Sequence, residues 1–184
     1  QSNINIDSIE LCSNVTCGNK VICFEYQGKI WKEGRKSMNY NRDYICIDSC
    51  KSIFGLNEIG MERITTNFKL EKIDKNNKYW ENNWKKTVTK EPVVYCCMNK
   101  INGVMLQQEK KLIDDKTILK DIFKIAIFRG IFRATDFCMR NIMITEDKRL
   151  FSIDEHEIGN RKSIIGSREN WLISKINDAN IANE

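Results

Sequence analysis

Polar side chains suited to holding a metal ion or a phosphate gather in one stretch, "TDFCMRNIMITEDKRLFSIDEHEIG" (residues 135–159). Asp136 precedes a short apolar run, Asn141 begins that run, and Asp154 ends the next one. Carboxylate and amide oxygens are the ligands that hard cations such as Mg²⁺ take. The pattern of loop, strand, charged turn and strand predicts one polar site at the strand ends. The structural alternative for Asp154 is a carboxylate that accepts hydrogen bonds from local backbone amides.

A lysine followed by acidic residues forms a second candidate group near the N-terminus. Lys32 lies at the end of the strand predicted in "KIWKEG", and Asp43 lies on the helix predicted to follow. A lysine ammonium binds phosphate oxygens as a point charge. Asp48 is on the same predicted helix and is the alternative partner of the lysine.

The first half of the chain is predicted to be rich in strands. Alternating apolar and aromatic residues favour strands over residues 8–31 and 62–73, and helical spacing favours a helix over 41–56 that Gly55 closes. A polar insertion or hairpin arm is expected over 74–91. It contains Trp80 and Trp84, which form a small satellite core or, alternatively, stack on a nucleobase.

The second half is predicted to be mainly helical. Pro92 precedes the strand "VVYCCM", which has the composition of a strand buried on both faces, and a turn containing Gly103 follows. The longest helix is expected from about Asp115 to Arg133, capped by Asp114 or Asp115. A short helix ends the chain, and the order of elements predicts an α+β fold.

The net charge of +5, from 30 Lys and Arg against 25 Asp and Glu, mildly favours anionic partners. Lysines are spread over the whole length rather than gathered in a patch, so we expect no nucleic-acid partner. No apolar run approaches the roughly 18 residues of a transmembrane segment. Gln1 is not a start residue, so we expect a trimmed N-terminus, and a removed leader remains an alternative.

Eight cysteines show no CxxC pair and no Cys/His spacing suited to zinc. We expect reduced, buried thiols and a cytoplasmic protein. The even count and the sequon at Asn14 support the alternative, a secreted protein with disulfides.

The motifs together resemble the kinase superfamily, most closely its phosphoinositide-kinase-like branch. "DFCMRNIMI" is similar to the catalytic loop, which has the pattern D-x-x-x-x-N, and "FSIDEHEIGNRKSIIGSRE" is similar to the activation segment. "WKEGRKSMNYNRD" resembles the lysine strand and the helix start, and "EPVVYCCMNKINGVML" resembles the strand and hinge between two lobes. The resemblance implies a kinase-like two-lobed fold, with a small antiparallel-sheet N-lobe over 1–98 and a reduced helical C-lobe over 99–184.

The resemblance also implies roles for individual residues. Asn141 and Asp154 would bind Mg²⁺, and Asp136 would be the catalytic residue that orients the acceptor hydroxyl or accepts its proton. Lys32, oriented by Asp43, would contact the ATP phosphates. The turn containing Gly18 would cover the nucleotide, and Met98 would form a wall of the adenine pocket.

The chain departs from the family at several positions. Cys138 stands where the family has a histidine, and Glu155 and His156 stand where Phe and Gly are usual. His156 is either a catalytic substitute or a structural residue. The acids Asp136, Asp154, Glu155 and Glu157 are expected to repel one another when no metal is bound.

We therefore expect a phosphotransferase that uses ATP and Mg²⁺. A catalytically degenerate pseudokinase that binds a nucleotide or a partner is the first alternative, and an unrelated α+β interaction protein is the second. The acceptor is expected to be a protein or a small molecule. A lipid headgroup held by Arg161, Lys162 and Arg168 is the alternative.

Overall fold

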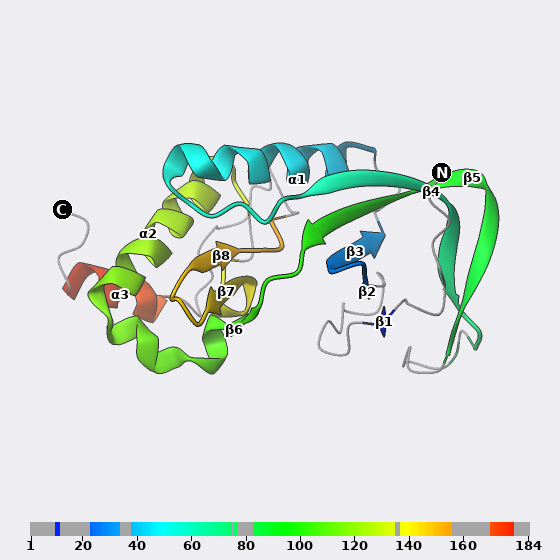
Figure 1. Ribbon diagram of the computed structural model, residues 1–184. Coiled ribbons are helices and arrows are strands. Elements are labelled where there is room, and N and C mark those ends of the chain that lie inside the picture. The colour runs from blue at the N-terminus through cyan, green and yellow to red at the C-terminus, as the bar shows by residue number, and fades with distance from the viewer. Residues whose placement is uncertain are drawn as a thin grey trace. The chain divides into compact units, whose positions relative to one another are not determined.

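The computed structural model describes residues 10–11, 23–33, 38–74, 76, 83–134, 137–155 and 170–178 (Figure 1). The chain divides into two compact units. The first comprises Gln1–Ile45 and Gly60–Lys100, and the second comprises Cys46–Ile59 and Ile101–Glu184. The sequence predicts a boundary after residue 98. In the structure, the second unit begins after Lys100 and also includes the earlier segment Cys46–Ile59.

The first unit contains a five-stranded antiparallel sheet in the order β1-β2-β3-β5-β4. Its strands are β1 (Glu10–Leu11), β2 (Cys23–Tyr26), β3 (Lys29–Glu33), β4 (Glu62–Lys72) and β5 (Trp84–Asn99). The β2–β3 turn consists of Gln27 at φ 51° and Gly28 at φ 70°. Two consecutive positive φ angles match the right-handed twist of the strands, which makes this a tight hairpin.

Aromatic side chains form the core of this unit. Phe24 and Trp31 are opposite each other on β2 and β3, with ring centroids 5.7 Å apart. Tyr95 on β5 packs edge-on against both, at 5.6 Å and 5.8 Å, and stacks on Phe68 at 5.7 Å. Such pairs contribute about 0.5–1.5 kcal/mol each beyond their buried area, so the core ties three neighbouring strands to the edge strand β4.

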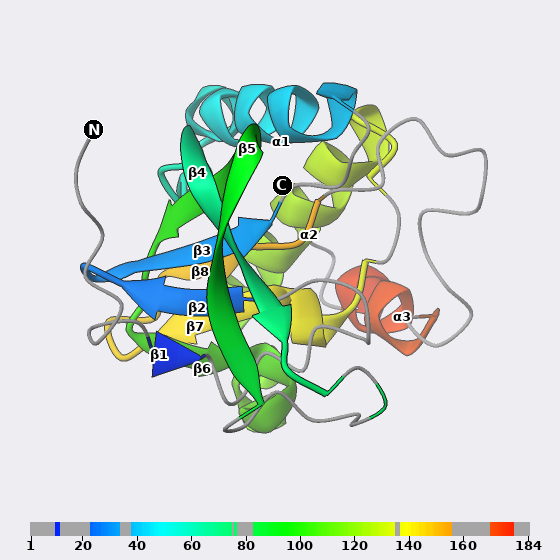
Figure 2. The ribbon, with the colours of Figure 1, turned by 90° about the vertical axis from the view of Figure 1, so that its right-hand side faces the viewer.

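Strands β4 and β5 form a long hairpin whose strands wind about each other (Figure 2). Of the two interpretations of residues 74–91, the hairpin arm agrees with the structure, because β5 begins at Trp84 and pairs with β4. Pro92 lies within β5, where the register shifts between Thr66 and Phe68 of β4. A β-bulge is the position in a strand that accepts proline, which cannot donate a ladder hydrogen bond. Trp84 packs against the aromatic core, whereas Trp80 lies outside the described residues.

The helix α1 (Met38–Cys50) begins in the first unit and ends in the second. It continues as the 3₁₀ turn η2 (Lys51–Phe54) and stops at Gly55, whose φ of 66° is the left-handed conformation of a C-cap. The predicted helix over 41–56 is therefore confirmed together with its terminator.

The second unit contains the antiparallel sheet β6-β7-β8 and the helices α2 (Lys116–Ile131) and α3 (Asn170–Asp178). Its strands are β6 (Gly103–Met105), β7 (Ile142–Thr145) and β8 (Leu150–Ser152). Short 3₁₀ turns connect them: η3 (Leu106–Gln108), η4 (Lys110–Asp114) and η5 (Met139–Asn141). The predicted turn at Gly103 is a strand start. A Cβ at Gly103 would lie 2.4 Å from the Ile144 carbonyl oxygen, so only glycine fits beside β7.

Helix α2 has the predicted cap and the predicted buried stripe. The Asp115 side chain accepts a hydrogen bond from the Thr117 amide at 2.9 Å. Ile118, Ile122 and Ile125 are buried in the core of the second unit. The two antiparallel sheets and the helices together confirm an α+β fold with small antiparallel sheets and few helices. No helix of the part of the chain that the structure describes is long and apolar enough to cross a membrane.

Candidate functional site

The β7–β8 hairpin brings two predicted metal ligands into adjacent positions. Ile142 of β7 is opposite Ser152 of β8, and the Asn141 carbonyl accepts a hydrogen bond from the Ile153 amide at 2.9 Å. Asp154 follows Ile153, so Asn141 and Asp154, which are thirteen positions apart in the sequence, lie near each other across the hairpin. Asn141 is 6% exposed. The structure thus places Asn141 and Asp154 at the same end of this hairpin.

Asp154 has an uncommon backbone conformation. Its φ is 59°, in the left-handed region, and it lies two residues after β8 ends at Ser152. For most residues with a Cβ this conformation costs about 1–2 kcal/mol, and Asp and Asn accept it more readily than the others. Non-glycine residues in this region persist where their surroundings over-determine the conformation, and they cluster at functional sites.

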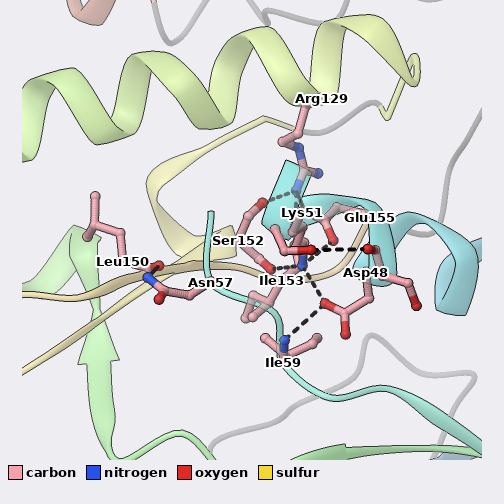
Figure 3. Close-up of polar contacts among 11 residues, drawn as sticks. Asp48, Lys51, Asn57, Ile59, Arg129, Leu150, Ser152, Ile153 and Glu155 are labelled. Carbon is pink, nitrogen blue, oxygen red and sulfur yellow. Dashed lines mark hydrogen bonds and ion pairs between the residues drawn. The ribbon is translucent and has the colours of Figure 1, made fainter. Parts of the chain in front are cut away.

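Arg129 of α2 holds the backbone of this segment (Figure 3). Its Nη1 donates to the Ile153 carbonyl at 3.0 Å and to the Ser152 hydroxyl at 3.1 Å, and its Nη2 donates to the Asp154 carbonyl at 3.5 Å. Hydrogen bonds from a charged donor contribute about 1.5–3 kcal/mol each. The contacts of Arg129 can therefore offset the conformational cost at Asp154.

Lys51 holds the same segment from the end of α1 (Figure 3). Its Nζ donates to the Ser152 carbonyl at 2.7 Å, and it forms ion pairs with Glu155 Oε2 at 2.8 Å and Asp48 Oδ1 at 3.0 Å. The side chains of Lys51 and Glu155 are both 0% exposed. The contact between them is an ion pair rather than a well-directed hydrogen bond.

The segment Cys46–Ile59 is also bound to β8 and to itself. Asp48 Oδ1 accepts a hydrogen bond from the Ile59 amide at 3.0 Å, and the Asn57 side chain donates to the Leu150 carbonyl at 2.8 Å. The 3₁₀ turn η2, which carries Lys51, is therefore fixed against the hairpin within the second unit.

The buried charges of this cluster balance. Lys51 and Arg129 are the cations, and Asp48 and Glu155 are the carboxylates, with Glu155 Oε1 3.9 Å from Arg129 Nη1. A buried ion pair gives little net stability compared with apolar residues of the same volume, but removal of one partner costs about 3–5 kcal/mol. The cluster is therefore sensitive to single substitutions.

These contacts correct one sequence expectation and add residues that the sequence did not indicate. Glu155 was expected to belong to a group of mutually repelling acids, but it is buried against Lys51. Lys51, Arg129 and Glu155 were not predicted as site residues. Two features of the sequence could have indicated them. Arg129 is a charged residue next to Phe128 among the buried residues of α2, and Lys51 follows Asp48 by three positions, a spacing that allows an ion pair on a helix.

The other predicted site residues are placed in part. Lys32 is half-buried on β3 opposite Cys96, and Met98 is half-buried on β5 opposite Ile30. Asp43 lies in α1. Asp136 and Gly18 lie outside the described residues, as do His156, Arg161, Lys162 and Arg168. The structure therefore brings Asn141 and Asp154 together, and the roles of all these residues stay predictions.

The thiols beside Met98 are protonated at neutral pH. Burial raises the pKa of Cys96 to about 11, and burial together with the Glu62 carboxylate raises the pKa of Cys97 to about 12. Buried protonated thiols are chemically inert. The six described cysteines (Cys23, Cys46, Cys50, Cys96, Cys97 and Cys138) have free thiols, and Cys12 and Cys17 lie outside the described residues.

The donor set suits a cation that also binds a substrate. Among the described residues there is no group of three or more His, Cys, Asp or Glu side chains that could hold a metal ion alone. Mg²⁺ is usually held by one or two protein carboxylates together with substrate phosphates and water. Asn141 and Asp154 fit that mode of binding.

No protein-family model matches the chain, and no curated protein is significantly similar to it.

Proposed function

We propose that the protein is an ATP- and Mg²⁺-dependent phosphotransferase with a kinase-like fold that acts on a hydroxyl acceptor. The observation that carries the proposal is the pairing of Asn141 with the residue before Asp154 across the β7–β8 hairpin. It supports a site in which an amide oxygen and a carboxylate bind one cation. Mg²⁺ bound there would neutralise charge on the transferred phosphoryl group.

The first unit supports a nucleotide-binding role. Among the described residues, Lys32 lies on the third strand of an antiparallel sheet, and the next described element is helix α1, which contains Asp43. Protein kinases have their phosphate-binding lysine on the third strand and an acid on the following helix. In the proposal, Lys32 binds phosphate oxygens and Asp43 orients the lysine.

The end of β5 supports the adenine-binding role of Met98. The β4 ladder begins at Glu62, opposite Cys97, so beyond this point β5 pairs only with β3. The backbone after Cys97 is therefore outside the β4 ladder on that edge. Adenine could meet this edge, and the Met98 side chain would pack against the ring.

Positioning and charge neutralisation supply most of the catalysis in phosphoryl transfer. Asp136 would orient the acceptor hydroxyl or accept its proton, and the turn at Gly18 would cover the phosphates. The acceptor is a protein or a small molecule in this proposal. A lipid headgroup bound by Arg161, Lys162 and Arg168 is the alternative acceptor.

The first test of the function is the melting temperature with Mg²⁺ alone and with Mg²⁺ and ATP. We expect nucleotide to stabilise the wild-type protein, by about 2.7 kcal/mol at a ligand concentration of 100 times Kd. Asp154→Asn should abolish the response to Mg²⁺ and ATP together with phosphoryl transfer, because it removes a metal-binding charge. An Asp154→Asn protein that still gains stability from Mg²⁺ and ATP would exclude the metal role.

A pseudokinase is the second candidate. It is favoured by Glu155, which is buried in an ion pair at the position after Asp154, where the family usually has Phe. Nucleotide-dependent stabilisation without Mg²⁺-dependent ATP hydrolysis would identify this alternative.

A further inference from the structure

We propose that Lys51, together with Arg129 and Glu155, is a positioning residue for metal binding: it sets the backbone conformation from which Asp154 presents its carboxylate. This inference rests on the proposed function. It assigns the metal affinity of the site partly to a lysine at the end of α1, and not only to the two ligands themselves.

The first step of the argument is the pattern of carbonyl contacts. The carbonyls of Ser152, Ile153 and Asp154 each accept a hydrogen bond from a buried cation, the first from Lys51 and the other two from Arg129. Three consecutive backbone groups are thus fixed just where the chain leaves β8. Asp154 lies within this fixed segment, in a conformation that a residue with a Cβ does not prefer.

The second step is the position of Glu155. Its carboxylate is 2.8 Å from Lys51 Nζ, and Glu155 follows Asp154 in the chain, whereas Ser152 precedes it. Lys51 therefore binds the chain both before and after Asp154, through the Ser152 carbonyl and the Glu155 side chain. A contact on each side of one residue restricts its φ and ψ angles more than either contact alone.

The third step is the anchoring of Lys51 itself. It follows α1 directly, η2 ends at Gly55, and Asp48 binds both the Lys51 ammonium and the Ile59 amide. The ammonium group donates one hydrogen bond, to the Ser152 carbonyl at 2.7 Å, and forms two ion pairs, with Glu155 at 2.8 Å and with Asp48 at 3.0 Å. Lys51 is therefore a rigid support for the Asp154 segment and not a mobile surface lysine.

The test needs a variant that removes Lys51 without leaving an unbalanced buried charge. In the double variant Asp48→Asn/Lys51→Met, Arg129 and Glu155 remain as one cation and one carboxylate. The Asn side-chain oxygen can still accept the hydrogen bond of the Ile59 amide. The variant is expected to fold, while the Lys51 contacts to Ser152 and Glu155 are lost.

A matched control is available on α2. Asp121 and Lys124 form an ion pair with the same three-residue spacing, at 2.9 Å, but both are substantially exposed. Asp121→Asn/Lys124→Met makes the same two chemical changes at a solvated pair. We expect no change in Mg²⁺ dependence for this control, because exposed pairs contribute little.

Two quantities are measured on the full chain. The first is the Mg²⁺ concentration at half-maximal ATP-dependent thermal stabilisation, which should rise about tenfold or more in the Asp48/Lys51 variant if a charged hydrogen bond supports the ligand geometry. The second is amide hydrogen exchange over residues 150–155 without nucleotide, which should become faster while α2 exchange is unchanged. A purely structural role of Lys51 would lower the melting temperature without raising the Mg²⁺ midpoint.

The outcomes separate this inference from the proposed function. A variant with the wild-type Mg²⁺ midpoint overturns the positioning role and leaves the phosphotransferase proposal intact. A wild-type protein that does not respond to Mg²⁺ and ATP overturns both. If the double variant does not fold, Glu155→Gln is measured in the same way, since it keeps the shape and weakens the attraction to Lys51. An unchanged midpoint and unchanged exchange in Glu155→Gln would then overturn the inference.

Discussion

At the scale of single residues, Asp154 combines a chemical and a conformational property. Its carboxylate is the proposed metal ligand, and its φ of 59° is disfavoured for all residues with a Cβ except, in part, Asn and Asp. Aspartate is therefore one of few residue types that supply a charge and accept this backbone conformation. The neighbouring carbonyls, bound by Lys51 and Arg129, account for the stability of the arrangement.

The conformational property can be measured separately from the chemistry. Asp154→Gly and Asp154→Ala both delete the carboxylate, but only alanine retains a Cβ in the left-handed conformation. We expect Asp154→Gly to be more stable than Asp154→Ala by about 1 kcal/mol, as measured by denaturant unfolding of both variants. An alanine variant as stable as the glycine variant would show that the segment does not hold this conformation in solution.

At the scale of elements, local patterns predicted the helices, the strand over 62–73 and a hairpin arm, but they did not locate the start of β5. The stripe of Ile118, Ile122 and Ile125 and the cap at Asp115 are properties of contiguous residues, so they could be predicted from the sequence. The first part of β5 is polar and pairs only with β4, so it lacks the alternation of a half-buried strand. Cross-strand pairing stabilises it, and this pairing is not visible in one segment alone.

The buried cluster could not be predicted for a related reason. Lys51 and the Ser152 carbonyl are 101 positions apart, and the Arg129 contacts to the same segment span 23 to 25 positions. Asn141 and Asp154 were predictable because one short hairpin joins them. A lysine whose partners lie on a distant hairpin has no such local signature.

Asn141 and Asp154 flank the strands of the β6-β7-β8 sheet, in which β6 and β7 approach each other closely. Gly103 of β6 lies against the Ile144 carbonyl, at a distance that leaves no room for a Cβ. We expect Gly103→Ala to destabilise the protein by about 1–3 kcal/mol, as overpacking does, in urea unfolding experiments. Gly55→Ala is an unsuitable control because its φ is positive, whereas Gly130→Ala is suitable because its Cβ would meet open space. Equal stability of the Gly103 and Gly130 variants would contradict the close packing of β6 on β7.

At the scale of the whole molecule, the proposed phosphate-binding residue Lys32 belongs to the first unit's sheet and is not part of its aromatic core. Trp31 is in the aromatic core, and successive residues of a strand point to opposite faces, so Lys32 points away from that core. Lys32 is opposite Cys96, and its charge is close enough to oppose the burial effect on the pKa of that thiol. Lys32 is therefore not a member of the aromatic core.

The Lys32→Met variant tests whether Lys32 acts in nucleotide binding and not in the stability of the protein. Methionine retains most of the apolar stem and removes the charge, so we expect loss of phosphoryl transfer and of ATP-dependent stabilisation with little change in the melting temperature of the free protein. Lys69→Met, at a partly exposed lysine of β4 that is paired with Glu71, is the control for the loss of one positive charge from the same sheet. The control should keep its response to Mg²⁺ and ATP. If Lys32→Met lowers the melting temperature and the activity in parallel, Lys32 is a structural residue, and the nucleotide phosphates must be bound elsewhere.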